Sequence, residues 1–178
     1  MAWGRKKSGG RTEPLFGLAA AMADLRLSPL DRIGAGDTPR DSKPKDVFAQ
    51  FRANDREGPI HMLNLVRLRA QAAYPDGRKA TGAEAYAAYG RDSGPVFERL
   101  GGRIVWQGRF ELMLIGPAEE RWDHCFIAEY PSVAAFAEMI RDPVYREAVK
   151  HRQAAVEDSR LIRHAVLPVG KNFGEIPE

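Results

Sequence analysis

The sequence predicts an α+β protein in which a four-stranded antiparallel sheet carries two helices on one face. Two observations support this fold class. Over residues 60–167, apolar segments of strand character and segments of helical periodicity follow one another in the order strand, helix, strand, strand, helix, strand. The strand segments are also apolar at nearly every position, which indicates a sheet that is covered on both faces.

The first strand follows a short leading helix. Residues 46–54 place apolar side chains at helical spacing, and a Gly-Pro pair ends that segment. Residues 60–68 (IHMLNLVRL) are then almost continuously apolar, as expected of a buried strand. Because side chains alternate along a strand, Asn64 shares a face with Met62.

The first main helix begins after Thr81. Thr81 and Glu84 have the spacing of a capping box, in which each side chain satisfies an unpaired amide of the other's backbone. Helical periodicity then continues to about Leu100 and includes Tyr89 on the apolar face. Pro95 lies inside this helix and is expected to bend or break it, because its ring clashes with the preceding turn.

Three more strands and one more helix complete the pattern. Residues 103–116 (RIVWQGRFELMLIG) are predicted to form one long strand, bent or bulged at Gly108. Residues 124–130 form the third strand, residues 132–157 a helix in two segments, and residues 159–167 the last strand. This element order is the ferredoxin-like split βαβ arrangement.

The chain is expected to divide into an arm, one folded domain and a tail. Residues 1–45 contain nine of the 27 Lys and Arg but only five of the 24 Asp and Glu, with six Gly and four Pro. We expect them to form a mostly disordered basic arm before a domain at 46–167 and a frayed tail at 168–178. The pI of 9.1 therefore reflects the arm, and the nearly neutral domain argues against nucleic-acid binding.

Composition also narrows the cellular setting. No apolar run approaches the roughly 18 residues that a membrane helix requires. The single cysteine, Cys125, cannot form a disulfide within the chain, which suits a reducing compartment. We expect a cytoplasmic protein without a membrane partner.

Two helices can cover only one face of the predicted sheet, yet the strands are apolar on both faces. The same face of a second copy is the simplest cover for the other side. The sequence thus predicts a homodimer that associates through its sheet faces.

Several motifs occur in register with those of a known family. They include MLNLVRLR at 62–69, AYAAYG at 85–90 and GGRIVWQGRFELMLIGP at 101–117. Over roughly residues 46–167 the chain closely resembles the domain of unknown function 1330 family in its longer form. The resemblance implies a dimeric α+β barrel, related in fold to cofactor-free monooxygenases, muconolactone isomerases and haem-handling proteins. It implies no reaction, since a fold alone does not define a function.

Asn64, Trp106 and Tyr89 are the first candidates for a binding site. The amide of Asn64 lies within an apolar strand, where it either holds a substrate oxygen or makes a structural hydrogen bond. Trp106 is expected on the same strand face as Ile104, as core or as a cavity wall. Tyr89 packs on a buried helix face with its hydroxyl at the edge of a cavity.

His151, Arg152 and Glu111 are the candidates for chemistry. A neutral His151 can accept a proton, and the adjacent guanidinium of Arg152 can hold an anionic substrate. The alternative places both side chains on a helix surface. Glu111, in the long second strand, is either a base or the partner of an arginine such as Arg109.

The histidines do not suggest a metal site. Four scattered histidines without a metal-binding spacing favour neither zinc nor another metal, and we expect no cofactor. A single histidine suffices to hold haem, so the histidine count leaves haem binding open.

Together these observations predict a protein that binds a small apolar or aromatic molecule between sheet and helices. The sequence leaves open whether the protein only binds that molecule or also acts on it as a cofactor-free enzyme of the oxygenase or isomerase type. The alternative is a non-catalytic dimeric binding or stress-related module, whose polar residues are structural.

Overall fold

The computed structural model describes residues 44–176. The expected basic arm lies outside the described residues, apart from its last two positions, and so do the last two residues of the expected tail. Within the described part, no helix is long and apolar enough to cross a membrane.

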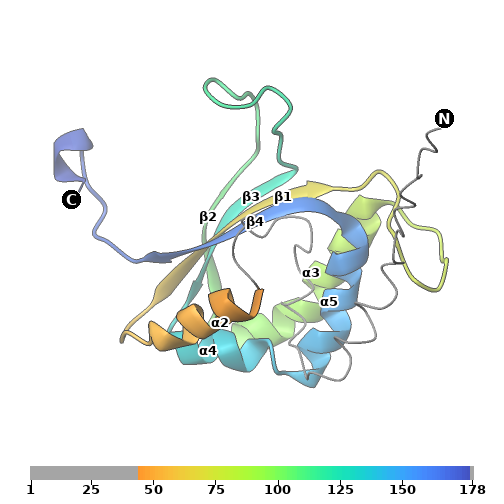
Figure 1. Ribbon diagram of the computed structural model, residues 1–178, viewed down its shortest axis with the longest axis horizontal. Coiled ribbons are helices and arrows are strands. Elements are labelled where there is room, and N and C mark those ends of the chain that lie inside the picture. Colours follow the sequence, from red (N-terminus) through yellow and green to blue (C-terminus); the bar gives the residue numbers. More distant parts are fainter. Residues whose placement is uncertain (1–43, 177–178) are drawn as a thin grey trace, which may run out of the picture.

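The described residues form one antiparallel sheet with helices on a single side (Figure 1). The four strands are β1 (Ile60–Leu68), β2 (Arg103–Gly108), β3 (His124–Tyr130) and β4 (Val156–Ala165), and their spatial order is β2-β3-β1-β4. The helices are α2 (Pro44–Ala53), α3 (Gly82–Arg99), α4 (Val133–Met139) and α5 (Pro143–Ala155). This order of elements and strands is the ferredoxin-like fold that the sequence predicts.

Strand β1 defines the two faces of the sheet. Its alternate residues from Ile60 to Val66 are buried against the helices, and we call this side the helix face. The intervening residues, including Leu63 and Leu65, lie on the other side, which we call the open face. Asn64 therefore belongs to the helix face, together with Met62, as the alternation predicts.

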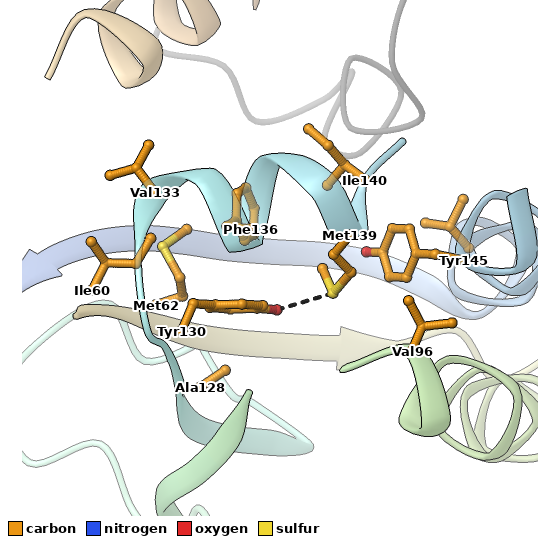
Figure 2. Packing of buried hydrophobic residues seen from close by; sticks show 11 residues of the cluster. Ile60, Met62, Val96, Ala128, Tyr130, Val133, Phe136, Met139, Ile140 and Tyr145 are labelled. Atoms are coloured by element: carbon orange, nitrogen blue, oxygen red, sulfur yellow. Dashed lines mark hydrogen bonds between the residues drawn. The ribbon is translucent and has the colours of Figure 1, made fainter. Parts of the chain in front are cut away.

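The core lies between the helix face and the helices (Figure 2). Tyr130 of β3 packs edge-on against Phe136 of α4, with ring centroids 5.0 Å apart. The hydroxyl of Tyr130 reaches the Met139 sulfur at 3.4 Å, so even this buried polar group has a partner. Helix α3 packs against α5, which brings the helix that carries Tyr89 beside the helix that carries His151 and Arg152.

Local sequence signals explain where the helices begin. The capping box at Thr81 and Glu84 is present, and both of its reciprocal hydrogen bonds form. Ser132 caps α4, and Asp142 caps α5 immediately before Pro143. Helix α5 ends at Ala155 and β4 begins at once, earlier than the sequence predicts.

Pro95 does not break α3, which runs without interruption to Arg99. Pro95 is exposed, so water can satisfy the carbonyl that loses its amide donor. The prediction of a break was therefore wrong.

The second strand is shorter than the sequence predicts. Strand β2 ends at Gly108, whose partner Cys125 lies next to the first residue of β3, so the edge strand has no further backbone to pair with. The following segment, 109–121, forms a loop that projects from the sheet (Figure 1). The predicted irregularity exists, but it lies between Ile104 and Trp106.

We predict that two glycines of α3 respond oppositely to alanine. A Cβ on Gly82 would come within 2.1 Å of the Arg69 carbonyl oxygen, whereas nothing lies within 4 Å of a Cβ on Gly90. G82A should lower the free energy of unfolding by about 1–3 kcal/mol through overpacking. G90A should raise it by about 0.5–1 kcal/mol, because glycine weakens a helix interior. Urea unfolding followed by circular dichroism measures both, and equal effects would contradict the close approach at Gly82.

Candidate functional site

The last turn of α5 directs two neighbouring candidates to different surroundings. Consecutive helical residues are about 100° apart, so His151 and Arg152 cannot face the same group. Arg152 is buried, and its electrostatic partners are tyrosines of α3 and α5. His151 contacts Tyr74 and Asp92 instead. The two residues therefore belong to two separate clusters.

Arg152 is a buried cation surrounded by phenols. Its side chain is 4% exposed, which contradicts the alternative of a helix-surface position. It forms a side-chain hydrogen bond with Tyr86 and also interacts with Tyr145. Among residues 44–176 no carboxylate forms an ion pair with it. A buried charge normally requires such a partner, and among the described residues the polar groups around this guanidinium are phenols.

Three tyrosines surround this position, and with Arg152 they form what we call the tyrosine–arginine cluster. The Tyr86 and Tyr89 rings lie 5.5 Å apart, and the Tyr89 and Tyr145 hydroxyls approach to 3.4 Å. Burial raises the pKa of Tyr86 and of Tyr145 well above the ordinary value near 10. Both phenols therefore stay protonated at neutral pH and can donate hydrogen bonds to an anion.

His124 extends the cluster towards the sheet. Its ring stacks on Tyr86 with centroids 4.7 Å apart and planes inclined by 17°. Burial lowers the pKa of His124, against a smaller opposing effect of Asp123. The imidazole is therefore neutral at pH 7 and serves as a flat aromatic surface with hydrogen-bonding nitrogens.

Asn64 lies on the helix face of β1, two residues from Val66, which is the residue that pairs with His124. The strand register pairs Asn64 with Phe126 of β3 and Leu161 of β4. Its amide nitrogen donates to the Met62 carbonyl oxygen at 2.9 Å. The buried amide thus has a structural partner, and its oxygen is the atom available for a ligand.

The structure separates Trp106 and Glu111 from this cluster. The register shift after Ile104 rotates Trp106 to the open face, opposite Ile127, where it is 50% exposed. The expectation that Trp106 and Ile104 share a face was therefore wrong. Glu111 lies beyond the end of β2, exposed in the projecting loop, so its expected place within an apolar strand was also wrong.

His151 is the centre of a second cluster, which sequence reasoning did not foresee. Its Nδ1 lies 2.6 Å from the Tyr74 hydroxyl, and its Nε2 lies 3.4 Å from a carboxylate oxygen of Asp92. The guanidinium of Arg78 lies over the Tyr74 ring, 3.7 Å from its centroid. The sequence places Tyr74 in a turn with no sign of this role, because its partner is 77 residues away. Among the described residues, no group of three or more metal-binding side chains gathers here or elsewhere.

The family assignment rests on a family model, and solved structures of similar proteins share the fold. The model of the domain of unknown function (DUF1330) matches residues 78–165. The RPA0582 protein of Rhodopseudomonas palustris, a protein of unknown function, is 79% identical, with a TM-score of 0.68 over 75% of this chain and 97% of that one. The chain belongs to the DUF1330 family. The methylated RPA0582 protein, in a second crystal structure, is 80% identical in sequence to this chain, with a TM-score of 0.70 over 76% of this chain and 96% of that one.

More distant likenesses add nothing specific to this DUF1330 protein. A dimeric protein of unknown function from Bacteroides fragilis, described as having a ferredoxin-like fold, is 12% identical. Its TM-score is 0.40 over 61% of this chain and 96% of that one. No curated protein matches the chain.

We predict that His124 makes the DUF1330 domain sensitive to mild acid. Its pKa in the folded state lies below the unfolded value near 6.5, so the unfolded chain binds a proton first as the pH falls. The stability contributed by neutral His124 is complete above pH 6.5 and is lost progressively below it. H124F keeps an aromatic ring against Tyr86 and should lose less stability than the wild type between pH 7 and pH 5 in urea unfolding. A His124 proton resonance that titrates at or above pH 6.5 would contradict the prediction.

Proposed function

We propose that this DUF1330 protein binds a small, largely apolar or aromatic molecule with one anionic group on the helix side of its sheet. The observation that carries the proposal is the buried Arg152 without a carboxylate partner among residues 44–176. Burying an ion costs several kcal/mol unless a counter-charge and hydrogen bonds compensate. A ligand carboxylate supplies both, because its two oxygens match the fork of the guanidinium.

The neighbouring side chains suit the rest of such a ligand. The protonated Tyr86 and Tyr145 hydroxyls can donate hydrogen bonds to the same anion. The stacked rings of Tyr86 and His124 offer a flat aromatic wall, and the oxygen of Asn64 can accept a hydrogen bond from a hydroxyl group. This arrangement supports an apolar body held by a few polar contacts.

A non-catalytic module remains the second candidate, and one observation favours it. The Asn64 amide nitrogen already bonds to the backbone of its own strand, as expected of a structural residue. In that case Arg152 fixes the packing of α5 through Tyr86, and the site binds no ligand.

The proposal includes a homodimer formed through the open faces. The strand registers align one apolar residue from each strand in a single row across this face, and we call it the apolar row. The row consists of Trp106, Ile127, Leu63 and Ile162. Its two ends are 50% and 43% exposed. A row of this kind on a sheet normally needs a cover, and the same row of a second copy is self-complementary.

We predict that R152M separates ligand binding from stability. Methionine fills a similar volume without the charge, so the free energy of unfolding should stay constant or rise. Benzoate, the probe for an aromatic anion, should bind at least about tenfold more weakly, because a charged hydrogen bond contributes about 1.5–3 kcal/mol. Isothermal titration calorimetry and urea unfolding give the two values. R146M, an exposed arginine of the same helix, is the matched control and should change neither.

The result also separates the two candidate functions. If R152M unfolds much more easily while benzoate binding is unchanged or undetectable in both proteins, Arg152 is structural and the non-catalytic module is favoured. Benzyl alcohol has a similar ring without the charge and should bind wild type and R152M alike.

We predict that a charge in the apolar row abolishes the dimer. I162E would bury a carboxylate from each copy in the apolar interface, which costs free energy of association. Light scattering should therefore give the mass of a dimer for the wild type and the mass of a monomer for the variant. V144E is the matched control, because Val144 is 55% exposed on α5, on the helix side of the molecule. A wild-type protein of monomeric mass would contradict the proposal.

A further inference from the structure

A groove of about 470 Å³ opens between α3, α5 and the loop at 69–81. Its apolar part is formed by Pro143, Val144 and Ala148 of α5. At the other end it meets His151, Asp92 of α3 and Arg78 of the loop. The groove therefore joins an apolar floor to the cluster in which His151 lies between a phenol and a carboxylate.

The contacts of His151 favour one tautomer of its ring. Nε2 lies 3.4 Å from an Asp92 carboxylate oxygen, which can only accept a hydrogen bond, so this contact favours a proton on Nε2. In that tautomer Nδ1 accepts from the Tyr74 hydroxyl, which lies 2.6 Å away. The other oxygen of Asp92 is held by Arg91 at 3.1 Å. A donor and an acceptor, Nε2–H and the carboxylate, thus lie side by side at the end of the groove.

Tyr74 is held rigidly behind the imidazole. The backbone amide of Ala73 donates to the Ala154 carbonyl oxygen at 2.9 Å, and that of Arg69 donates to Ala155 at 2.8 Å. These bonds satisfy the last carbonyls of α5 and fix the loop to the helix that carries His151 (Figure 1). The Arg78 guanidinium over the phenol ring would stabilise negative charge on Tyr74.

We propose that this groove is an acid–base site that enolises a small carbonyl compound. The Asp92 carboxylate takes a proton from the carbon next to the carbonyl, and that C–H bond breaks. His151 gives its Nε2 proton to the carbonyl oxygen, and the Tyr74 hydroxyl passes its proton to Nδ1. The substrate becomes the enol, Asp92 is left protonated and Tyr74 is left as a phenolate beside Arg78, so protons and charge balance. Water restores both groups after the product leaves.

The lining defines the substrate class. The apolar floor accommodates a small hydrocarbon or aryl body, while Arg78 and Lys150 place positive charge near the opening. Lys150 is paired with Glu147 and Arg78 with Asp76, and both pairs are exposed, so an acidic group of the substrate has to replace a surface carboxylate at one of these cations. A 2-keto acid with an apolar side chain has both features. The groove is lined by His151 and not by Arg152, and the inference does not depend on ligand binding at the tyrosine–arginine cluster.

The test uses phenylpyruvate and the full chain. Proton NMR in deuterium oxide follows exchange of the C3 protons, which is the enolisation step itself. The wild type should accelerate exchange above the buffer rate, and H151Q and D92N should each reduce the acceleration by about 100-fold or more. H164Q, a change at an exposed histidine on β4, is the matched control and should retain the acceleration.

Tyr74 requires a readout that a structural role would not change. In Y74F the imidazole loses its donor at Nδ1, so nitrogen NMR should show His151 shifting from the Nε2–H tautomer to a mixture, and exchange should fall. If the wild type does not accelerate exchange above the buffer rate, the groove is not an acid–base site. The same conclusion follows if H151Q and D92N accelerate exchange as much as the wild type.

Discussion

Strand β1 is hydrogen-bonded to β3 on one side and to β4 on the other. This pairing decides where the apolar row lies on the open face and where Asn64 lies on the helix face. Its register aligns the side chains of the four strands in rows. The row through Leu63 is apolar and lies on the open face, whereas the row through Asn64 faces the helices. A slip of one residue would exchange the two faces and expose the buried row to water, so the register is strongly constrained.

Helix α5 adds the second constraint, because its last turn separates His151 from Arg152. Arg152 becomes a buried cation among neutral phenols, without a carboxylate partner in residues 44–176. His151 becomes a hydrogen-bonded ring at the end of a surface groove. Two residues that form one cluster in the sequence thus support two different proposals, an anion site and an acid–base site.

The predicted fold was confirmed where local signals dominate. The limits of β1 and the capping box of α3 agree with the sequence, because strand alternation and capping depend on a few neighbouring residues. The prediction failed for the second strand. Its length depends on where β3 offers a partner, and the face of Trp106 depends on a bulge, neither of which is encoded in apolar character.

The sequence by itself determined the element order, the ferredoxin-like fold and the face of the sheet to which Asn64 belongs. These properties follow from the spacing of neighbouring residues along one strand or helix. Only the tertiary structure decided that Tyr74 meets His151, that Arg152 is buried and that Glu111 lies outside the sheet. Such contacts join residues far apart in the chain, and no local periodicity specifies which long-range partners come together.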